Sequence, residues 1–242
     1  MGIVRQVAKL ALDWLTESDG YLTRGWKLRQ DDHFSAQQPA ISLTFDDGPH
    51  PEYTPRLLDA LARAEMRATF FVIGEKAERY PNIIRRIDDE GHDVGNHTWT
   101  HGEPRETSTK KFLQEVQRTE ELIQNLTSKS PRLVRPPKGE LGFGKLAAML
   151  RADWSVVLWN RDCKDYLMTE EHQMRRWANE YRPRHGDFVL MHDRLPHAIT
   201  AVETLAARKE LGLVSYCPVF QWLRWPEPRK EKPLVSPPVT LS

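Results

Sequence analysis

Cysteine, long apolar runs and an excess of one charge sign are all scarce in this chain of 242 residues. Its two cysteines, Cys163 and Cys217, are too few for a disulfide framework and are compatible with a reducing compartment. The net charge is only +1, whereas a dedicated nucleic-acid-binding domain carries a strongly basic face. Apolar residues make up 39% and charged residues 29%, which is typical of a globular protein and excludes a disordered chain.

The N-terminal segment also lacks the features of a membrane span or a secretory signal. No run in the chain approaches the roughly 20 apolar residues that a transmembrane helix needs. Lys9 and Asp13 interrupt the mildly apolar start, so it has no unbroken apolar region of about 7–15 residues. Apolar side chains recur there at helical spacing, at Ile3, Val7, Leu10 and Trp14. We expect a helix packed on the core, with an interfacial helix on a membrane as the alternative, and a cytoplasmic location that includes the cytoplasmic face of the membrane.

Short apolar runs alternate with helical patterns along the rest of the chain, which predicts an α/β fold with parallel strands. Seven runs are expected to be strands: 41–45, 68–73, 92–94, 133–135, 155–159, 188–191 and 213–216. One helix is expected to open at Thr54 as N-cap and Pro55 as its first residue, and a second to run from Pro81 to a stop at Gly91. Further helices are expected over 108–126, 145–150, 170–181 and 198–209.

This pattern divides the chain into three parts. We expect an N-terminal helical extension over residues 1–34 and a catalytic domain over residues 35–223. Residues 224–242 are expected to form a flexible tail, because they combine five prolines with charged and small polar residues.

Polar clusters follow the predicted strands at their carboxyl ends, the edge at which parallel α/β folds bind ligands. Asp46 and Asp47 follow the first strand, and two histidines follow the third. Further polar residues close the fourth, fifth and sixth strands: Arg135, Asp162, Asp165 and His192. This segregation predicts one shared site.

Two of these clusters suit a metal ion. Adjacent carboxylates such as Asp46 and Asp47 repel each other and call for a cation beside them, although the stretch also reads as a turn-forming Asp-Gly-Pro loop. His97 and His101 are four residues apart, and on a helical turn this spacing places both on one face. Such a pair is often structural, but one carboxylate with two imidazoles makes a three-ligand site with an open position, which is the catalytic pattern for zinc.

The motifs together carry a family resemblance. TFDDGP at 44–49, HTWTH at 97–101, RPPKG at 135–139, the segment 162–165 and LMH at 190–192 come in one order along the chain. Their order and spacing resemble the polysaccharide deacetylase family, the NodB homology domain of carbohydrate esterase type, over about residues 39–216. The resemblance implies a distorted (β/α) barrel of about seven parallel strands with outer helices. It also implies a metal-dependent hydrolase that removes an acetyl group from an N-acetylated amino sugar.

The matched motifs imply a metal site and a base. By resemblance, the metal ligands are Asp47, His97 and His101, and the metal is divalent, with Zn²⁺ expected and Co²⁺ as the alternative. Asp46 resembles the general base, and Arg135 the arginine that holds it. A carboxylate beside such cations can take a proton from water.

The same motifs imply an acid on the other side of the substrate. His192 resembles the general acid, and Asp165 the carboxylate that orients it. The departing amine needs a proton, and a carboxylate neighbour favours the imidazolium that supplies it. We expect the oxyanion to meet the metal and a backbone N–H near Lys138 or Gly139.

The sequence departs from the family pattern at three positions. Lys138 replaces an aromatic residue, which suggests either an anionic group on the substrate or a surface lysine without contact. Tyr166 stands where an Asp-Trp pair is usual, so Asp162 and Asp165 could exchange roles. Cys163, between them, is expected to be a small buried residue, with a redox-sensitive thiol as the alternative.

Three functions remain open at this stage. The first is deacetylation of an N-acetylated sugar or glycan, including a lipid-linked precursor. The second is deacylation of a non-carbohydrate amide, and the third is glycan binding by a catalytically dead protein.

Overall fold

The computed structural model describes residues 21–22, 40–127, 132–208, 211, 215–216 and 218–219. The predicted N-terminal helix, the predicted tail over 224–242 and Cys217 lie outside these residues, so they stay predictions. Of the predicted extension, only Tyr21–Leu22 is described, and these two residues form strand β1.

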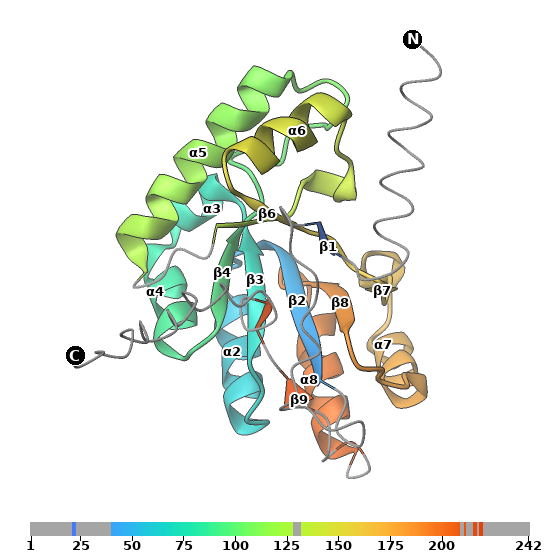
Figure 1. Cartoon of the computed structure of the whole chain (residues 1–242). Helices are drawn as coiled ribbons and strands as arrows, with labels where there is room; N and C mark the ends of the chain where they lie inside the picture. The colour runs from blue at the N-terminus through green and yellow to red at the C-terminus, as the bar shows by residue number, and fades with distance from the viewer. Residues whose placement is uncertain are drawn as a thin grey trace, which may run out of the picture.

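The strands form one curled sheet whose centre is β2 (Ala40–Gly48) (Figure 1). The strand order is β1-β6-β5-β4-β3-β2-β8-β7, and β9 pairs with the start of β2. The remaining bounds are β3 Ala68–Val72, β4 Asp93–Asn96, β5 Leu133–Val134, β6 Ser155–Val157, β7 Arg161–Asp162, β8 Asp187–His192 and β9 Ser215–Tyr216. Strands β2 to β8 run parallel, and β1 is antiparallel to β6. The predicted parallel α/β arrangement is therefore confirmed.

Strand β2 is covered on both faces, as a central parallel strand must be. Ile41, Leu43 and Phe45 belong to the main apolar core, and Ser42 and Thr44, on the other face, are also buried. The ring of Phe45 packs on that of Phe70 in β3 at 5.1 Å between centroids. This packing holds the carboxyl end of β2 rigidly between β3 and β8.

Helices enclose the sheet from outside (Figure 1). Their bounds are α2 Tyr53–Arg63, α3 Gly74–Arg79, α4 Pro81–Asp89, α5 Thr109–Leu126, α6 Phe143–Arg151, α7 Glu171–Glu180 and α8 His197–Ala207. Helix α7 packs on α8, α8 on α2, α2 on α4, α4 on α5, and α5 on α6. Single 3₁₀ turns, η1 (Pro137–Gly139) and η2 (Asp165–Leu167), follow β5 and β7. Among the described helices, none is both long enough and apolar enough to span a membrane.

The predicted start of the first helix is wrong. Helix α2 begins at Tyr53 with Glu52 as N-cap, and His50 Nδ1, rather than the Glu52 side chain, accepts from the Glu52 and Tyr53 N–H groups at 3.2 Å. The Thr54 hydroxyl is instead buried: it accepts from the His50 N–H at 2.7 Å and donates to Asp193 Oδ2 at 2.6 Å. Because this hydroxyl bridges two segments, it is not available to the helix terminus.

Strand β7 and helix α3 were not predicted. Strand β7 has two residues and helix α3 has six, of which only Gly74 and Ala77 are buried. Neither is long enough to display a periodic apolar pattern. The longer elements match their predicted ranges to within a few residues.

Candidate metal centre and active site

The carboxyl edge of the sheet brings the predicted site residues together. Asp46 and Asp47 lie at the end of β2, and His192 is the last residue of β8, directly beside Asp46 in the strand register. Arg135 follows β5, and His97 follows β4. The polar clusters therefore share one site, as their positions after the strands predict.

Arg135 is fully buried, and its guanidinium donates hydrogen bonds to groups at this edge of the sheet. It donates to Asp46 Oδ1 at 2.8 Å and to Thr44 Oγ1 at 2.7 Å. Two further bonds go to the carbonyl oxygens of Val157 and Leu158, at 3.2 and 3.0 Å. A buried charge needs such partners, because its transfer from water is otherwise costly. The bonds leave Asp46 Oδ2, which lies 3.7 Å from His97 Nε2, facing the site.

Asp47, His97 and His101 form a group of three metal-ligand atoms that all lie within 4.8 Å of one another. Asp47 Oδ1 lies 3.5 Å from His97 Nε2 and 3.4 Å from His101 Nε2. His97 Nδ1 bonds the carbonyl oxygen of Arg135 at 2.7 Å. Since a carbonyl can only accept, Nδ1 carries the proton and Nε2 presents its lone pair to the site.

The chemistry of this donor set fits a divalent cation. Asp47 Oδ1 is buried and has no hydrogen-bond partner among the described residues, although buried carboxylate oxygens are normally paired. Burial alone would raise the pKa of Asp47, but the three nearby histidines, His97 above all, hold it well below its usual range. Burial and then the charge of His97 lower the pKa of His101. An ionised carboxylate and neutral imidazoles are the forms that bind metal.

The helical turn expected for the two histidines is wrong. They lie in an irregular loop in which Thr98 and His101 have left-handed φ values of 66° and 54°. The first residues of α3 donate to this loop, from the Gly74 N–H to the Thr98 carbonyl at 2.9 Å and from the Glu75 N–H to the Trp99 carbonyl at 3.1 Å. The two rings converge, with 4.8 Å between centroids, through the loop conformation rather than through helical periodicity.

His192 and Asp165 form a pair close to Asp47, with His192 Nε2 4.0 Å from Asp47 Oδ2. His192 Nδ1 lies 2.7 Å from Asp165 Oδ1, and the His192 N–H donates to Asp165 Oδ2 at 2.7 Å. Burial lowers the pKa of His192, but the hydrogen bond and charge of fully buried Asp165 outweigh it, so the pKa lies above its usual value. Asp162 instead accepts from the Lys164 N–H and the Tyr166 hydroxyl. Of the two acids, the one in contact with His192 is therefore Asp165.

The other two departures from the family pattern resolve differently. Lys138 donates to Glu103 Oε1 at 2.6 Å in an exposed ion pair, so it is not a lysine without contact. It could bind an anionic group of the substrate only if this ion pair broke. Cys163 is buried and donates to the Leu190 carbonyl, and burial raises the pKa of its thiol well above the usual value. Cys163 is thus the small buried residue that the sequence predicts, because a protonated, enclosed thiol reacts poorly.

Two cations at Asp47 were not singled out from the sequence. Arg194 Nε donates to Asp47 Oδ2 at 2.8 Å, and Lys76 Nζ donates to the Asp47 carbonyl at 2.7 Å. Together they fix the carboxylate so that Oδ1 faces the histidines. Arg194 lies two residues after His192, past the same strand end, so its position was a usable signal. Lys76 lies in the unpredicted helix α3, so nothing in the sequence pattern pointed to it.

The chain is similar in sequence to known deacetylases. A family model described as polysaccharide deacetylase matches residues 35–154. A peptidoglycan-N-acetylglucosamine deacetylase of Bacillus cereus is 39% identical over 126 residues, 52% of this chain and 46% of that protein. The chain thus spans about half the length of this relative.

Other relatives are matched over most of their length. A second Bacillus cereus protein with the same name is 31% identical over 179 residues, 73% of this chain and 79% of the relative. The solved structure of peptidoglycan deacetylase PdaC from Bacillus subtilis superposes with a TM-score of 0.70 at 30% identity, covering 78% of this chain and 92% of that one. The curled sheet with outer helices is accordingly the distorted (β/α) barrel that the resemblance implies, and the chain belongs to the polysaccharide deacetylase family.

Proposed function

We propose that this protein is a metal-dependent hydrolase that removes the acetyl group from an N-acetylated amino sugar of a glycan. The observation that carries the proposal is the placement of two hydrogen-bonded pairs, Asp46 with Arg135 and His192 with Asp165, beside the three-ligand cluster of Asp47, His97 and His101. Asp46 Oδ2 lies 3.7 Å from His97 Nε2, and His192 Nε2 lies 4.0 Å from Asp47 Oδ2. Amide hydrolysis needs this combination: a base for water, an acid for the amine and a cation for the carbonyl.

The three ligands would hold the metal, and zinc fits them best, because two imidazoles and one carboxylate leave an open position on a tetrahedral ion. Cobalt is the alternative. When bound, such a metal supplies a Lewis acid that polarises the acetamide carbonyl and makes water a better nucleophile near neutral pH.

The chain's own groups then divide the proton transfers. Arg135 holds Asp46 Oδ1, so Oδ2 is the oxygen that faces the site and accepts the proton from the attacking water. Asp165 holds Nδ1 of His192, so Nε2 carries the proton to the nitrogen of the departing amine. The raised pKa of His192 favours the protonated form that the departing amine needs. The Gly139 N–H donates to the Pro136 carbonyl at 3.0 Å, so of the two backbone groups expected to meet the oxyanion the Lys138 N–H is the proposed donor.

The substrate class follows from the relatives, which are named as deacetylases of peptidoglycan N-acetylglucosamine. We therefore propose a glycan that contains acetylated amino sugars. Deacylation of a non-carbohydrate amide and glycan binding without catalysis are the competing functions. The complete set of acid, base and ligand groups favours a hydrolase over a binding protein.

The test is acetate release from acetylated chitooligosaccharides and from peptidoglycan fragments, together with elemental analysis of the dialysed protein. We expect one equivalent of a divalent metal, activity that a chelator removes, and recovery of activity with zinc or cobalt. The His97→Ala/His101→Ala variant should lose both metal and activity. Glycan binding with no acetate release by the metal-loaded protein would favour the binding function, and stoichiometric metal in the double variant would refute the ligand set.

A further inference from the structure

The His97–His101 loop, which connects β4 to α5 over residues 97–108, depends on contacts from outside the loop for its conformation. Thr98 and His101 occupy the left-handed region, which is unfavourable for non-glycine residues and persists only when the surroundings enforce it. Asn96 enforces the first turn, because its Oδ1 accepts from the Thr98 N–H at 2.9 Å while its Nδ2 donates to the Val116 carbonyl at 2.8 Å. The half of the loop nearer His101 needs a different support.

Glu115 of α5 supports this second half. It is only 8% exposed, and both carboxylate oxygens lie 3.0 Å from the Thr100 hydroxyl. Glu115 Oε2 also accepts from the Thr100 N–H at 3.1 Å. Thr100 directly precedes His101, so this carboxylate fixes the peptide that leads into the proposed ligand. Lys111 lies beside Glu115 as well, but it is exposed and its ammonium is 3.9 Å from Glu115 Oε1.

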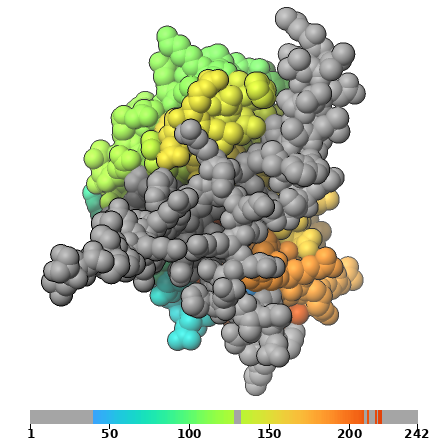
Figure 2. Space-filling view, viewed as in Figure 1, coloured from blue at the N-terminus to red at the C-terminus, as the bar shows by residue number. Residues whose placement is uncertain are grey.

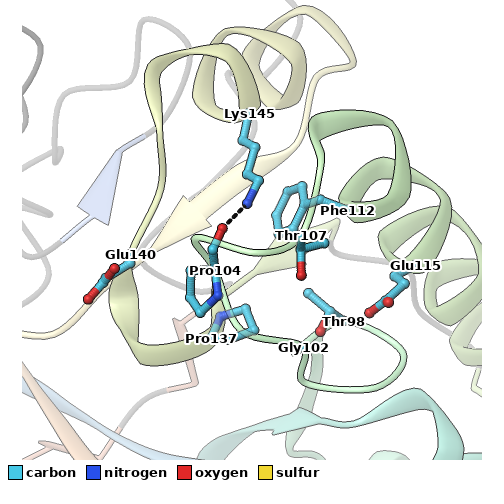
Figure 3. A pocket seen from close by; sticks show the side chains of 9 residues that line it. All are labelled: Thr98, Gly102, Pro104, Thr107, Phe112, Glu115, Pro137, Glu140 and Lys145. Atoms are coloured by element: carbon cyan, nitrogen blue, oxygen red, sulfur yellow. Dashed lines mark hydrogen bonds between the residues drawn. The ribbon is translucent and has the colours of Figure 1, made fainter. Parts of the chain in front are cut away.

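Lys145 of α6 holds the far end of the same loop. Its side chain is largely buried, at 7% exposure, and its ammonium donates to the Pro104 carbonyl at 2.5 Å (Figure 3). The ammonium also lies over the Phe112 ring, 5.4 Å from the centroid. Burial lowers the pKa of Lys145, so a lysine in this position is costly to keep. Among the described residues, the hydrogen-bond partner of its ammonium is the Pro104 carbonyl of the loop.

The space between the loop and the two helices is almost completely filled. Figure 3 shows Glu115 and Lys145 on two sides of a cavity of about 10 Å³ that the loop residues Thr98, Gly102 and Pro104 close. Figure 2 shows α5 and α6 packed side by side on the outside. A loop with so little free volume behind it shifts only if these polar contacts break.

We propose that Glu115 and Lys145 are positioning residues for the metal centre, which set its affinity by holding the His97–His101 loop without touching the metal. The assignment rests on the proposed function, because it takes these histidines as ligands. Groups that orient metal ligands through one intervening contact change metal affinity by about 10–100-fold when they are removed. Here the intervening contacts are Thr100 for Glu115 and Pro104 for Lys145.

The experiment measures zinc affinity by competition with a chromogenic chelator in Glu115→Gln and Lys145→Met. Each variant keeps the volume of the side chain and removes its charge. We expect Kd for zinc to rise at least about 10-fold in each variant, with kcat restored at saturating zinc. The visible spectrum of the cobalt-loaded protein should change as well, because it reports the geometry of the ligands. Lys111→Met is the matched control, because it removes the exposed lysine beside Glu115 and leaves the Thr100 contacts in place. Its zinc affinity should equal that of the wild type.

A second pair of variants tests the Glu115 contact independently, and it decides the role of Glu115 if Glu115→Gln prevents folding. Thr100→Ser keeps the hydroxyl that Glu115 binds, whereas Thr100→Val removes it with little change in shape. We expect weaker zinc binding in Thr100→Val only. Zinc affinity within twofold of wild type in Glu115→Gln and Lys145→Met, or in Thr100→Val, would overturn the assignment while leaving the proposed function intact. A wild-type protein that binds no zinc or cobalt would overturn both.

Discussion

Replacing Arg135 by methionine should destabilise the protein far more than an average substitution. The guanidinium is fully buried, and its loss removes four hydrogen bonds, one of them to the buried carboxylate of Asp46. Breaking a buried ion pair by removing one partner costs about 3–5 kcal/mol, because the other charge stays behind without compensation. In a chain of this size, about 1 kcal/mol corresponds to about 2–4 °C in Tm, so we expect Tm to fall by roughly 6–20 °C.

The assay is thermal unfolding for Tm and urea unfolding for the free energy of unfolding, both followed by circular dichroism with a chelator present throughout. The chelator matters because a metal that binds only the folded state would add its own binding free energy to the result. Asp46→Asn is the informative companion variant, since it keeps the shape of the partner but removes its charge. The double variant Arg135→Met/Asp46→Asn should recover part of the lost stability, because no uncompensated charge remains at the end of β2.

Two results would refute this reasoning. One is an Arg135→Met protein that unfolds within about 1 kcal/mol of the wild type, which would mean that water or another group compensates Asp46 at no cost. The other is strict additivity in the double variant, since residues in direct contact normally show interaction energies of about 0.5–3 kcal/mol.

Three further predictions concern the reaction and the thiol. Asp46→Asn should keep its metal and lose about 100-fold or more in kcat, as expected for a general base; metal loss on elemental analysis would instead make Asp46 a ligand. Asp165→Asn should move the alkaline limb of the kcat/KM profile to lower pH. Asp165 raises the pKa of His192, the acid must be protonated, and activity is therefore lost as pH rises through that pKa; an unmoved limb would refute the pairing. Cys163 should resist iodoacetamide in the native protein and react once it is unfolded, as read by mass spectrometry of its peptide, because burial keeps the thiol protonated; rapid native labelling would contradict this.

The site was more predictable from the sequence than the loops that shape it. Strand periodicity located the ends of β2, β5 and β8, and parallel pairing then brought Asp46, Arg135 and His192 to one edge. These inferences depend on the spacing of apolar residues and on the order of the strands along the chain, and both can be read from the sequence alone. The contact between Asp165 and His192 depends on η2, a single turn with no periodic signal, so the sequence assignment of Asp165 kept Asp162 as an alternative.

The convergence of the two histidines was inferred correctly from a wrong conformation. Four-residue spacing suits a helix, but the structure reaches the same proximity through left-handed residues at 98 and 101. Such φ values are set by tertiary contacts from α3 and α5, which no local pattern encodes. The same reason hides Glu115 and Lys145, since each looks like an ordinary charged helix residue in the sequence.

Arg135 serves two groups of the site through different atoms. Its guanidinium holds Asp46, while its backbone carbonyl orients His97. A side-chain substitution can change the first contact and leave the second in place, because every amino acid brings the same carbonyl. An insertion or deletion between β5 and η1, by contrast, would displace both at once. This short connection therefore couples the position of the proposed base to that of the proposed metal ligand His97. A point substitution at Arg135 disturbs only the contact with Asp46, whereas a change in length disturbs both contacts.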